Sequence, residues 1–466
     1  MKRLARNFLS LASSEIARKV LGFFAVAYLA RKLTVSDFGL VSLCFTILSY
    51  TINIGTAGFN LYGMRQTAAG IDTSLPGKLL SLRLVSAGIV FGLTALVAIL
   101  FVRDPMIVKL IIAFNFSLFA YAMLLEWYFQ GKEEMHTVSF GKSVTAAVYL
   151  ALVLLFVRTD KDVIWIAVAA VAGDFVMMLF YYARFRQEGH ELHLSIDRRA
   201  WKDMIRQSFP LGLGMVLGQI SINLAPLVLA VMMTKVEIGL YSAASKLVVF
   251  LLLFDRVFGV LLLPASARIQ AASPGQLAPR LGEALRWILV TALPVCVGGV
   301  LVSNDMIRMV FGENYAVAAG LFRILIWFLC FTMIHTVYTS GLVAVAPSKV
   351  YGRVMTISAV IYFAAIVGLT KFYGLYGTVF GVVISEGLTL LIARRSLKPY
   401  LEVKVSIPIH WTIAALVAMI FGVVALQNYH VVLRIVAGAS LYSSVILLFR
   451  VCTVSEFVAL VWRKSS

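Results

Sequence analysis

The sequence predicts an all-α integral membrane protein with about 14 transmembrane helices, and three observations support this fold class. First, hydrophobic residues make up 61% of the 466-residue chain, charged residues make up 14%, and the mean hydropathy is +0.93. Second, apolar runs of about 20 residues, which is the length that crosses a bilayer core, recur along the whole chain. Third, these runs are continuous rather than alternating, which favours helices over the strands of a barrel.

The predicted transmembrane helices are connected by polar segments. In order, they lie at residues 8–31, 38–61, 79–102, 106–128, 139–157, 162–183, 209–233, 239–263, 281–303, 317–344, 352–371, 375–393, 409–427 and 431–452. With the N-terminus in the cytoplasm, most Lys and Arg residues outside the helices fall on the cytoplasmic side, so both termini are predicted there. This asymmetry explains most of the net charge of +19 without nucleic-acid binding, which we do not expect.

An internal repeat divides the chain into two halves. Leu29-Ala30, Thr34, Gly39-Leu40 and Ser42 recur at a constant offset as Leu229-Ala230, Thr234, Gly239-Leu240 and Ser242. Each half starts inside and contains six helices, so the halves are predicted to share one topology. The predicted domains are an N-lobe at 1–183, a cytoplasmic linker at 184–208, a C-lobe at 209–393, and two further helices with a cytoplasmic tail at 394–466.

The first predicted helix carries charges within its span. If it began after Lys19, residues 20–30 would cover only about 16 Å at a rise of about 1.5 Å per residue, which is too short. A spanning helix therefore holds Glu15, Arg18 and Lys19 in or near the membrane. Because such charges cost about 2.5–3.5 kcal/mol each in lipid, they should face a protein or aqueous interior. The alternative is that the two bases reach the cytoplasmic headgroups from a tilted helix.

Other ionisable residues also fall inside the predicted helices. They are Arg83 and Asp174 in the first half and Lys246, Asp255, Arg256, Arg323 and Glu386 in the second. Because unpaired bases in a closed bundle would be too costly, we predict a water-filled, cationic cavity between the halves. Such a cavity suits an anionic cargo, and arginine suits a phosphate group. His335 is expected to be a hydrogen-bonded interior residue, with a proton carrier as the alternative.

No catalytic or metal-binding pattern stands out in the sequence. Gly141-Lys142-Ser143 lacks the upstream glycine and the preceding strand of a phosphate-binding loop, so no ATPase is predicted. His190 and His193 have no third ligand nearby, and a solvated surface explains them better than a metal site. We therefore expect neither an enzyme nor a resident cofactor.

Three Gly-x-x-x-Gly patterns lie within the predicted helices. They are Gly88 with Gly92, Gly214 with Gly218, and Gly377 with Gly381. Small residues at this spacing let neighbouring helices approach closely, so all three patterns predict close helix packing.

Several short motifs carry a resemblance to a known family. They are a basic start with Asn7, the span end Leu29-Ala30-Arg31-Lys32-Leu33, the turn Ser36-Asp37-Phe38-Gly39, the helix end Gly55-Thr56-Ala57-Gly58, and the second-half segments Phe209-Pro210-Leu211-Gly212 and Ile238-Gly239-Leu240-Tyr241-Ser242. Over nearly its whole length, the chain resembles Wzx-type oligosaccharide-lipid flippases. These belong to the multidrug/oligosaccharidyl-lipid/polysaccharide (MOP) exporter superfamily.

The resemblance implies a fold, a cargo and roles for the charged residues. It implies two six-helix lobes around a central cavity, with two extra helices, in the cytoplasmic (inner) membrane of a bacterium. The cargo would be an undecaprenyl-diphosphate-linked oligosaccharide, turned to the outer leaflet by alternating access with H⁺ or Na⁺ coupling. The implied diphosphate-binding bases are Arg18, Lys19, Arg83, Arg256 and Arg323. Candidates for ion coupling or charge balance are Glu15, Asp174, Asp255 and Glu386. Membrane lipids, a polysaccharide polymerase and a chain-length regulator are the expected partners.

Three other functions compete with this interpretation. A multidrug exporter of the same superfamily would need an acidic cavity, whereas here bases outnumber acids inside the predicted helices. A flippase for a lipid-linked peptidoglycan precursor is a second alternative. A membrane-embedded polysaccharide polymerase or glycosyltransferase would need a large outer loop with catalytic acids or bases, and no such loop is visible in the sequence.

Overall fold

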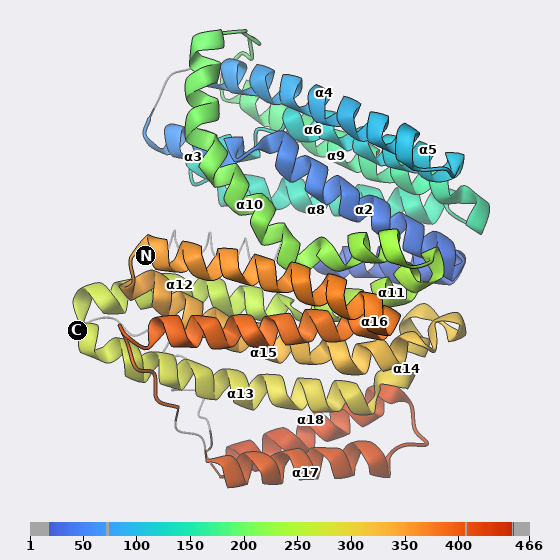
Figure 1. Ribbon diagram of the computed structural model, residues 1–466, viewed down its shortest axis with the longest axis vertical. Helices are drawn as coiled ribbons and strands as arrows, with labels where there is room; N and C mark the ends of the chain where they lie inside the picture. The colour runs from blue at the N-terminus through green and yellow to red at the C-terminus, as the bar shows by residue number, and fades with distance from the viewer. Residues whose placement is uncertain (1–17, 71–73, 406–407, 450, 452–466) are drawn as a thin grey trace. The chain divides into compact units, whose positions relative to one another are not determined.

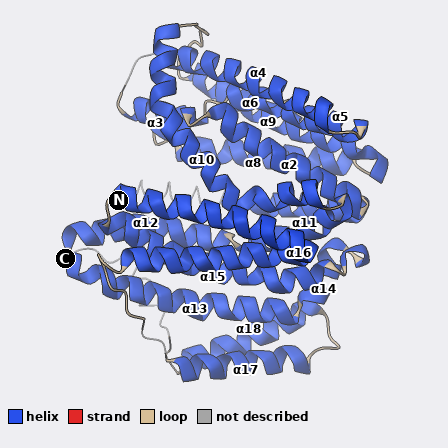
Figure 2. Ribbon diagram, viewed as in Figure 1, coloured by secondary structure: helices blue, strands red, loops and turns tan. Residues whose placement is uncertain are grey.

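The structure is a computed structural model that describes residues 18–70, 74–405, 408–449 and 451. Within these ranges every regular element is a helix (Figure 2). Ten helices in the described part of the chain are long and apolar enough to cross a membrane. The all-α, multi-pass fold class is therefore confirmed, and the number of 14 transmembrane helices stays a prediction.

The contacts divide the chain into two compact units, Met1–Gly239 and Leu240–Ser466. The first unit starts with helical residues 18–32. It continues with α2 (Val35–Thr56), α3 (Phe59–Ala68), α4 (Leu75–Phe101), α5 (Pro105–Asn115), α6 (Ser117–Ala122), α7 (Glu126–Gly131), α8 (Met135–Phe156), α9 (Val163–Gln187) and α10 (Arg198–Met232). Helix α9 packs against α5, α6 and α8, and α4 packs against α2, α5 and α6 (Figure 1).

Helix α10 packs on the helices of the first unit. It contacts α2, α3 and α4. At Gly58, which turns the chain between α2 and α3 with φ of 78°, a β-carbon would collide with the backbone of Ser208 and Gly212. A residue with a side chain would also be strained at this φ, so glycine serves both the turn and the close approach. The predicted linker at 184–208 and the predicted lobe boundaries stay predictions.

The repeated segment begins a helix in both halves. Thr34 caps α2, where its side chain accepts a hydrogen bond from the backbone N–H of Asp37. In the second copy the backbone N–H of Thr234 donates to the Glu237 carboxylate at 2.8 Å, at the start of α11 (Lys235–Leu251). Both are capping arrangements that satisfy free groups at a helix start. The predicted turn Ser36–Gly39 is instead the first turn of α2.

The two copies of this segment touch at their equivalent glycines. A β-carbon built on Gly39 would lie 2.6 Å from the backbone nitrogen of Gly239, and one built on Gly239 would collide with the carbonyl of Val35. Next to this crossing, Lys235 Nζ lies 2.6 Å from Asp104 Oδ2, just before α5. This hydrogen bond with Lys235 holds the pKa of the Asp104 carboxyl below its ordinary value. The start of α11 is thus tied to the first unit.

We expect Gly39→Ala to destabilise the protein by about 1–3 kcal/mol, because the added methyl meets backbone atoms rather than flexible side chains. Gly88→Ala is the matched control, since a β-carbon there meets no described atom within 4 Å. The midpoint of thermal unfolding in detergent measures both variants. Equal midpoints for the two variants would show that the crossing at Gly39 is looser than its geometry implies.

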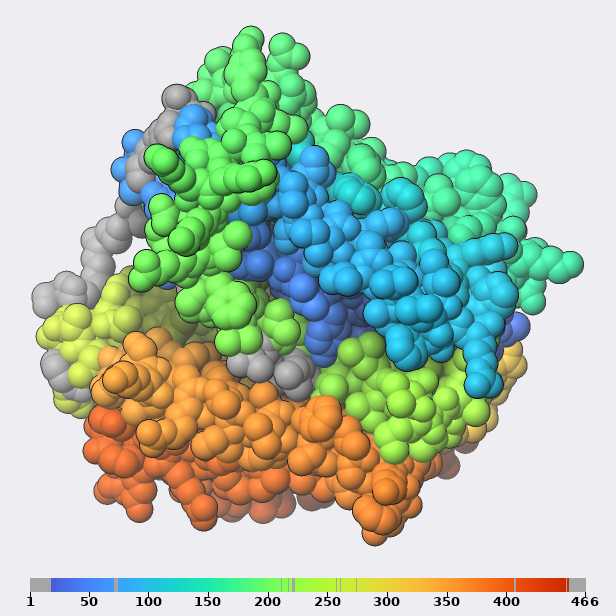
Figure 3. Space-filling model, turned by 45° about the horizontal axis from the view of Figure 1, so that its top comes forward, coloured from blue at the N-terminus to red at the C-terminus, as the bar shows by residue number. Residues whose placement is uncertain are grey.

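Among the described residues, one of the three Gly-x-x-x-Gly patterns packs closely, the prediction is wrong for Gly88 and Gly92, and it stays a prediction for Gly214 and Gly218. A β-carbon on Gly377 or Gly381 would meet the backbone of the preceding helical segment, whereas Gly88, Gly92, Gly214 and Gly218 have no described atom within 4 Å of that position. Gly88 and Gly92 lie on an exposed, apolar face of α4 with Ile89, Leu93 and Leu100. Figure 3 shows this helix on the surface of the first unit. Such a face suits contact with lipid rather than with another helix.

The remaining helices belong to the second unit, with α11 crossing the boundary. They are α12 (Leu253–Ala272), α13 (Leu277–Leu301), α14 (Ser303–Phe311), α15 (Ala318–Val345), α16 (Ser348–Leu397), α17 (Ile409–Ala425) and α18 (Val431–Leu448). Helix α15 packs against α12, α13 and α16, and α17 pairs with α18 (Figure 1). Short 3₁₀ turns at Asp160–Asp162, Pro274–Gln276 and Glu313–Tyr315 complete the described elements.

Helix α16 consists of two arms that fold back on each other. Its backbone leaves the helical conformation at Gly374, with φ of 59° and ψ of −138°. The hydroxyls of Thr370 and Thr378, one on each arm, lie 2.8 Å apart. The predicted helices 352–371 and 375–393 correspond to these two arms, so the predicted break is confirmed.

The predicted helix 106–128 is wrong in one respect, because the chain breaks into α5, α6 and α7. Between α6 and α7, Met123 (φ −91°, ψ 0°) and Leu125 (φ −93°, ψ 16°) leave the helical conformation. A break in a membrane helix frees backbone carbonyls that need new donors. The donor here comes from α4, and it is one of the predicted site residues.

Candidate functional site

Arg83 braces the break between α6 and α7. Its guanidinium donates to the carbonyl of Leu124 at 2.9 Å and to the carbonyl of Tyr121. The side chain is only 1% exposed. Arginine suits this position, because its planar fork of donors can serve two carbonyls at once. In this structure, therefore, the predicted diphosphate-binding base Arg83 contacts the protein backbone.

Several polar residues gather around the same break. We call Arg18, Arg83, Ser117, Tyr121, Glu126 and Asp174 the first-unit polar cluster. The charges of Asp174, Glu126 and Arg18 all act on the Tyr121 hydroxyl, and that of Glu126 also acts on Arg83. Asp174 is buried, and its charge acts on Tyr121. Glu126 also forms an ion pair with a residue outside the cluster, because Lys142 Nζ lies 2.7 Å from its carboxylate. The structure thus brings together Arg18, Arg83 and Asp174.

A second set of polar residues lies inside the second unit. We call Asp255, Arg256, His335, Thr336, Tyr362 and Glu386 the second-unit polar cluster. The buried Glu386 carboxylate accepts a hydrogen bond from the Tyr362 hydroxyl and lies 3.0 Å from Nδ1 of His335. Thr336 donates to Asp255 at 2.7 Å. The charges of Glu386, His335 and Arg256 act on Asp255, which joins the two parts of the cluster. The His335 ring is hydrogen-bonded and partly buried, an arrangement that fits both the interior role and the proton-carrier role.

The other predicted residues are more scattered. Lys19, like Arg18, is half-buried on the helix at residues 18–32. Arg323 is exposed and donates to the Ser303 hydroxyl at 2.7 Å. It lies about 18 Å from His335 along α15, at about 1.5 Å per residue, so it belongs to neither cluster. Glu15 lies outside the described residues.

Sequence reasoning missed part of both clusters. Ser117, Tyr121, Thr336 and Tyr362 are uncharged, so a search for buried charge passes over them. Glu126 was placed inside the predicted helix 106–128 but was not singled out. The one available signal was its position in an apolar run, which marks an ionisable residue in a membrane helix as a functional candidate.

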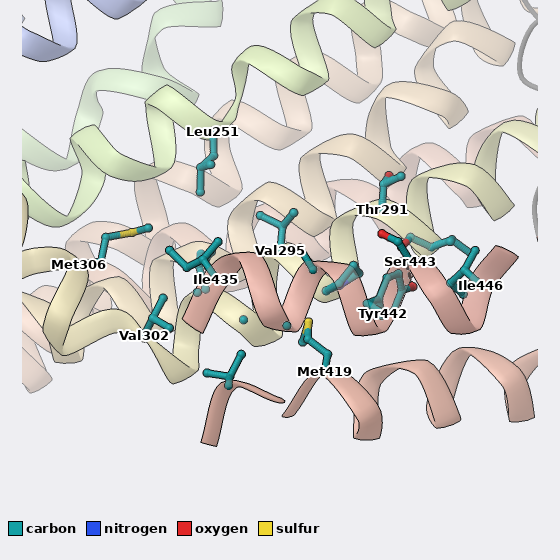
Figure 4. A pocket seen from close by; sticks show the side chains of 18 of the residues that line it. Leu251, Thr291, Val295, Val302, Met306, Met419, Ile435, Tyr442, Ser443 and Ile446 are labelled. Atoms are coloured by element: carbon teal, nitrogen blue, oxygen red, sulfur yellow. Dashed lines mark hydrogen bonds between the residues drawn. The ribbon is translucent and has the colours of Figure 1, made fainter. Parts of the chain in front are cut away.

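An apolar pocket of 580 Å³ lies between α13, α15 and the α17–α18 pair. Its labelled lining residues come mainly from α13 and α18, and Leu251 from the end of α11 closes one side (Figure 4). Among the labelled side chains, the hydroxyls of Thr291 and Ser443 lie at one end, and Met306 lies toward the other. The lining otherwise consists mostly of aliphatic and small residues, which suits an apolar chain.

Comparison with protein families identifies the chain. A family model described as polysaccharide biosynthesis protein matches residues 4–270, which is more than half of the chain. The chain belongs to this family. One curated relative is described as a candidate O-antigen transporter of Shigella dysenteriae. It is 18% identical over 410 residues, which cover 85% of this chain and 100% of the relative.

Solved structures share the fold of this member of the polysaccharide biosynthesis protein family. The lipid II flippase MurJ in an inward closed conformation matches with a TM-score of 0.74 at 14% identity, covering 94% of this chain and 98% of that one. An inward-facing multidrug resistance MATE transporter of the MOP superfamily matches with a TM-score of 0.59 at 16% identity, covering 84% and 94%. The predicted superfamily fold is confirmed, and all of these relatives are described as transporters or flippases rather than enzymes.

Proposed function

We propose that this protein is a flippase that turns an undecaprenyl-diphosphate-linked oligosaccharide from the inner to the outer leaflet of a bacterial cytoplasmic membrane. One observation carries the proposal. A chain of the polysaccharide biosynthesis protein family has, over 94% of its length, the fold of a lipid II flippase. The cargo would be the repeat unit of an O-antigen, capsule or exopolysaccharide. The protein is a transporter and not an enzyme in this account.

The excess of bases over acids inside the predicted helices supports transport of an anionic head group. A diphosphate that enters hydrocarbon loses its hydration, and the loss is very costly. Basic side chains replace that hydration with charge-assisted hydrogen bonds. We propose that Arg18, Lys19 and Arg256 bind the diphosphate in a cationic cavity. Arg83 and Arg323 stay on the proposed list, although Arg83 would have to release the carbonyls that it braces here.

Ion coupling is the proposed source of energy, because no nucleotide-binding pattern is present in the sequence. H⁺ and Na⁺ are the candidate ions. The carboxylates proposed to respond to them are Asp174, Asp255 and Glu386 in the two polar clusters, together with Glu15. A carboxylate inside a membrane helix is expensive to keep charged, so it binds a cation or proton readily.

We propose that part of the polyprenyl tail enters the apolar pocket of the second unit. Ala439→Phe, which narrows this pocket from α18, should then lower transport severalfold without lowering stability. Val436→Phe is the matched control, because Val436 is exposed on the same helix and does not line the pocket. Export of glycan by cells that carry each variant measures the effect. Equal export in the two variants would separate the pocket from the transport path.

A flippase for a lipid-linked peptidoglycan precursor is the second candidate. The specific observation in its favour is the TM-score of 0.74 with the lipid II flippase. Complementation distinguishes the two candidates. The gene should restore surface glycan in a strain that lacks its own oligosaccharide flippase, and it should not sustain growth of a strain that lacks its lipid II flippase. The opposite pattern would favour the peptidoglycan precursor.

Location and partners can be tested in the same strains. We propose that both termini lie in the cytoplasm of the inner membrane, so a fluorescent protein fused to either terminus should fluoresce and a periplasmic reporter should stay inactive. Co-purification tests the proposed association with a polysaccharide polymerase and a chain-length regulator. Periplasmic reporter activity at either terminus would reverse the proposed orientation.

A further inference from the structure

One ring nitrogen in the second-unit polar cluster has no hydrogen-bond partner among the described residues. Nε2 of His335 is buried and makes no hydrogen bond to any described residue. Nδ1 of the same ring faces Oε1 of Glu386 at 3.0 Å. Because an ionised carboxylate only accepts hydrogen bonds, Nδ1 carries the hydrogen in this contact. Nε2 of the neutral ring then carries a lone pair and is the atom that can take up a proton.

The charges around this ring leave room for one more positive charge. Asp255 and Glu386 are acids, and Arg256 is the base that acts on Asp255. The phenol of Tyr362 donates to Glu386, and Tyr241 of α11 is the further titratable group that acts on Tyr362. With a neutral imidazole, the two carboxylates exceed the one guanidinium among the described residues of the cluster. A proton on His335 removes this net negative charge, which is costly in the interior of a membrane protein.

The first unit has a related cluster with one chemical difference. Asp174 lies near the middle of the sixth predicted helix of the first half, and Glu386 lies near the middle of the sixth predicted helix of the second half. Asp174 acts on Tyr121, which lies in the fourth predicted helix of the first half. Glu386 contacts His335, which lies in the fourth predicted helix of the second half. The base that acts on Tyr121 is Arg18. Guanidinium groups in general keep their proton in proteins. Imidazole, by contrast, changes its charge near neutral pH.

We propose that His335, Glu386 and Tyr362 form a proton-binding site, and that the proton enters and leaves at Nε2 of His335. The role of this site in transport rests on the proposed function, whereas proton binding itself does not. Each step balances without another reactant, because an N–H bond forms at Nε2 with a proton from water and the same bond later breaks. The side chain of His335 is 15% exposed, whereas Nε2 itself is buried, so a proton passes from water at the ring edge to a shielded atom.

The site links three helical segments, so a change in its charge can alter the contacts between these segments. His335 lies on α15, Tyr362 on the first arm of α16 and Glu386 on the second arm. A charged imidazole attracts the Glu386 carboxylate more strongly than a neutral one does. Gain or loss of the proton therefore strengthens or weakens the contact that joins α15 to the second arm of α16, whose Glu386 also accepts from Tyr362 on the first arm.

A sodium ion is the competing ligand, and the geometry favours the proton. Sodium needs several oxygen ligands, but both oxygens of Glu386 already accept hydrogen bonds from His335 and Tyr362. One oxygen of Asp255 accepts from Thr336. The groups that surround Glu386 thus carry exchangeable hydrogens, whereas a sodium site would present free oxygens.

The first test measures proton binding without cargo. Nuclear magnetic resonance of the full chain with ¹⁵N-labelled histidine, in lipid nanodiscs, reports the charge of each ring, and His335→Gln assigns one signal. Spectra recorded between pH 5 and pH 9 should show proton uptake by the His335 ring, and Glu386→Gln should alter that uptake. A His335 ring that keeps one charge state across this range would overturn the site. Proton uptake that is unchanged in Glu386→Gln would overturn it as well.

The second test measures coupling in proteoliposomes with lipid-linked oligosaccharide. An imposed pH gradient should accelerate wild-type transport, and His335→Gln and Glu386→Gln should each lose at least tenfold of that acceleration. His193→Gln is the matched control, because His193 also faces a glutamate, Glu191, at 3.2 Å but on an exposed surface. Tyr362→Phe should keep part of the acceleration, since it removes a donor and leaves the carboxylate and the ring.

The outcomes separate the proton site from the proposed function. If the pH gradient accelerates transport equally in the wild type and in the His335 and Glu386 variants, the proton site is overturned and the flippase function stands. Transport that a sodium gradient drives without a pH gradient would replace the proton with sodium. Absence of any transport by the wild type, together with a titrating His335, would count against the function and not against the proton site.

Discussion

Arg83→Met should destabilise the protein by about 2–4 kcal/mol and lower the amount of folded protein in the membrane. The variant leaves the carbonyl of Leu124 without its side-chain donor, and it removes one of the donors to the carbonyl of Tyr121, which keeps the backbone N–H of Leu124 at 3.3 Å. Each buried acceptor without a partner costs about 1–3 kcal/mol. Such a loss is a large share of the marginal stability of a folded protein. Thermal unfolding in detergent and the yield of monodisperse protein measure the effect.

Two control variants separate the loss of the hydrogen bonds from the loss of an arginine charge. Arg83→Lys keeps the charge but not the fork of donors, so it should recover only part of the stability. Arg103 is exposed and lies just after the end of α4, so Arg103→Met should change the stability of the protein little. A variant at Arg83 that is as stable as the wild type but fails to export glycan would show that the guanidinium serves the cargo rather than the helix break.

The double variant Arg18→Ala, Lys19→Ala should lower glycan export by about 10–100-fold while the protein still inserts into the membrane. A hydrogen bond to a charged group contributes about 1.5–3 kcal/mol, and each 1.4 kcal/mol corresponds to about a tenfold change. Both side chains are half-buried, so their loss should cost less stability than the loss of Arg83. Surface glycan and accumulated lipid-linked precursor, measured in the same cells, report the effect.

The conservative variant and a distant variant complete the experiment. Arg18→Lys keeps the positive charge and should retain most of the export. Lys202→Ala removes an exposed base from α10 and should leave export unchanged. Normal export by the double variant would remove Arg18 and Lys19 from the proposed diphosphate site, whatever its effect on stability.

Local sequence patterns predicted the fold class because hydrophobic length is itself the physical requirement for crossing a membrane. The break at Gly374 was also predictable, since polar and glycine residues interrupt the apolar run there. The break after Ala122 was not. The run 106–128 is apolar, and Arg83, which donates to the carbonyls at the break, is 41 residues from Leu124 in the sequence.

The same distinction holds for the candidate site. Buried charge was visible in the sequence, because Asp174, Asp255 and Glu386 stand out in apolar runs. Their partners were not visible, since His335 and Glu386 are 51 residues apart and no local pattern connects them. The glycines of α4 show the opposite error. Their spacing suggested close packing, but spacing does not say whether a helix face meets protein or lipid.

The most direct measurement is the leaflet position of a lipid-linked oligosaccharide in vesicles that contain the purified full chain. A lectin that cannot cross the membrane reports the glycan on the outer face. With the protein present, glycan initially confined to the inner leaflet should become accessible to the lectin, and the Arg18, Lys19 double variant should slow this change at least tenfold. Glycan that stays in the inner leaflet at the rate of protein-free vesicles, with folded protein inserted, would contradict the account.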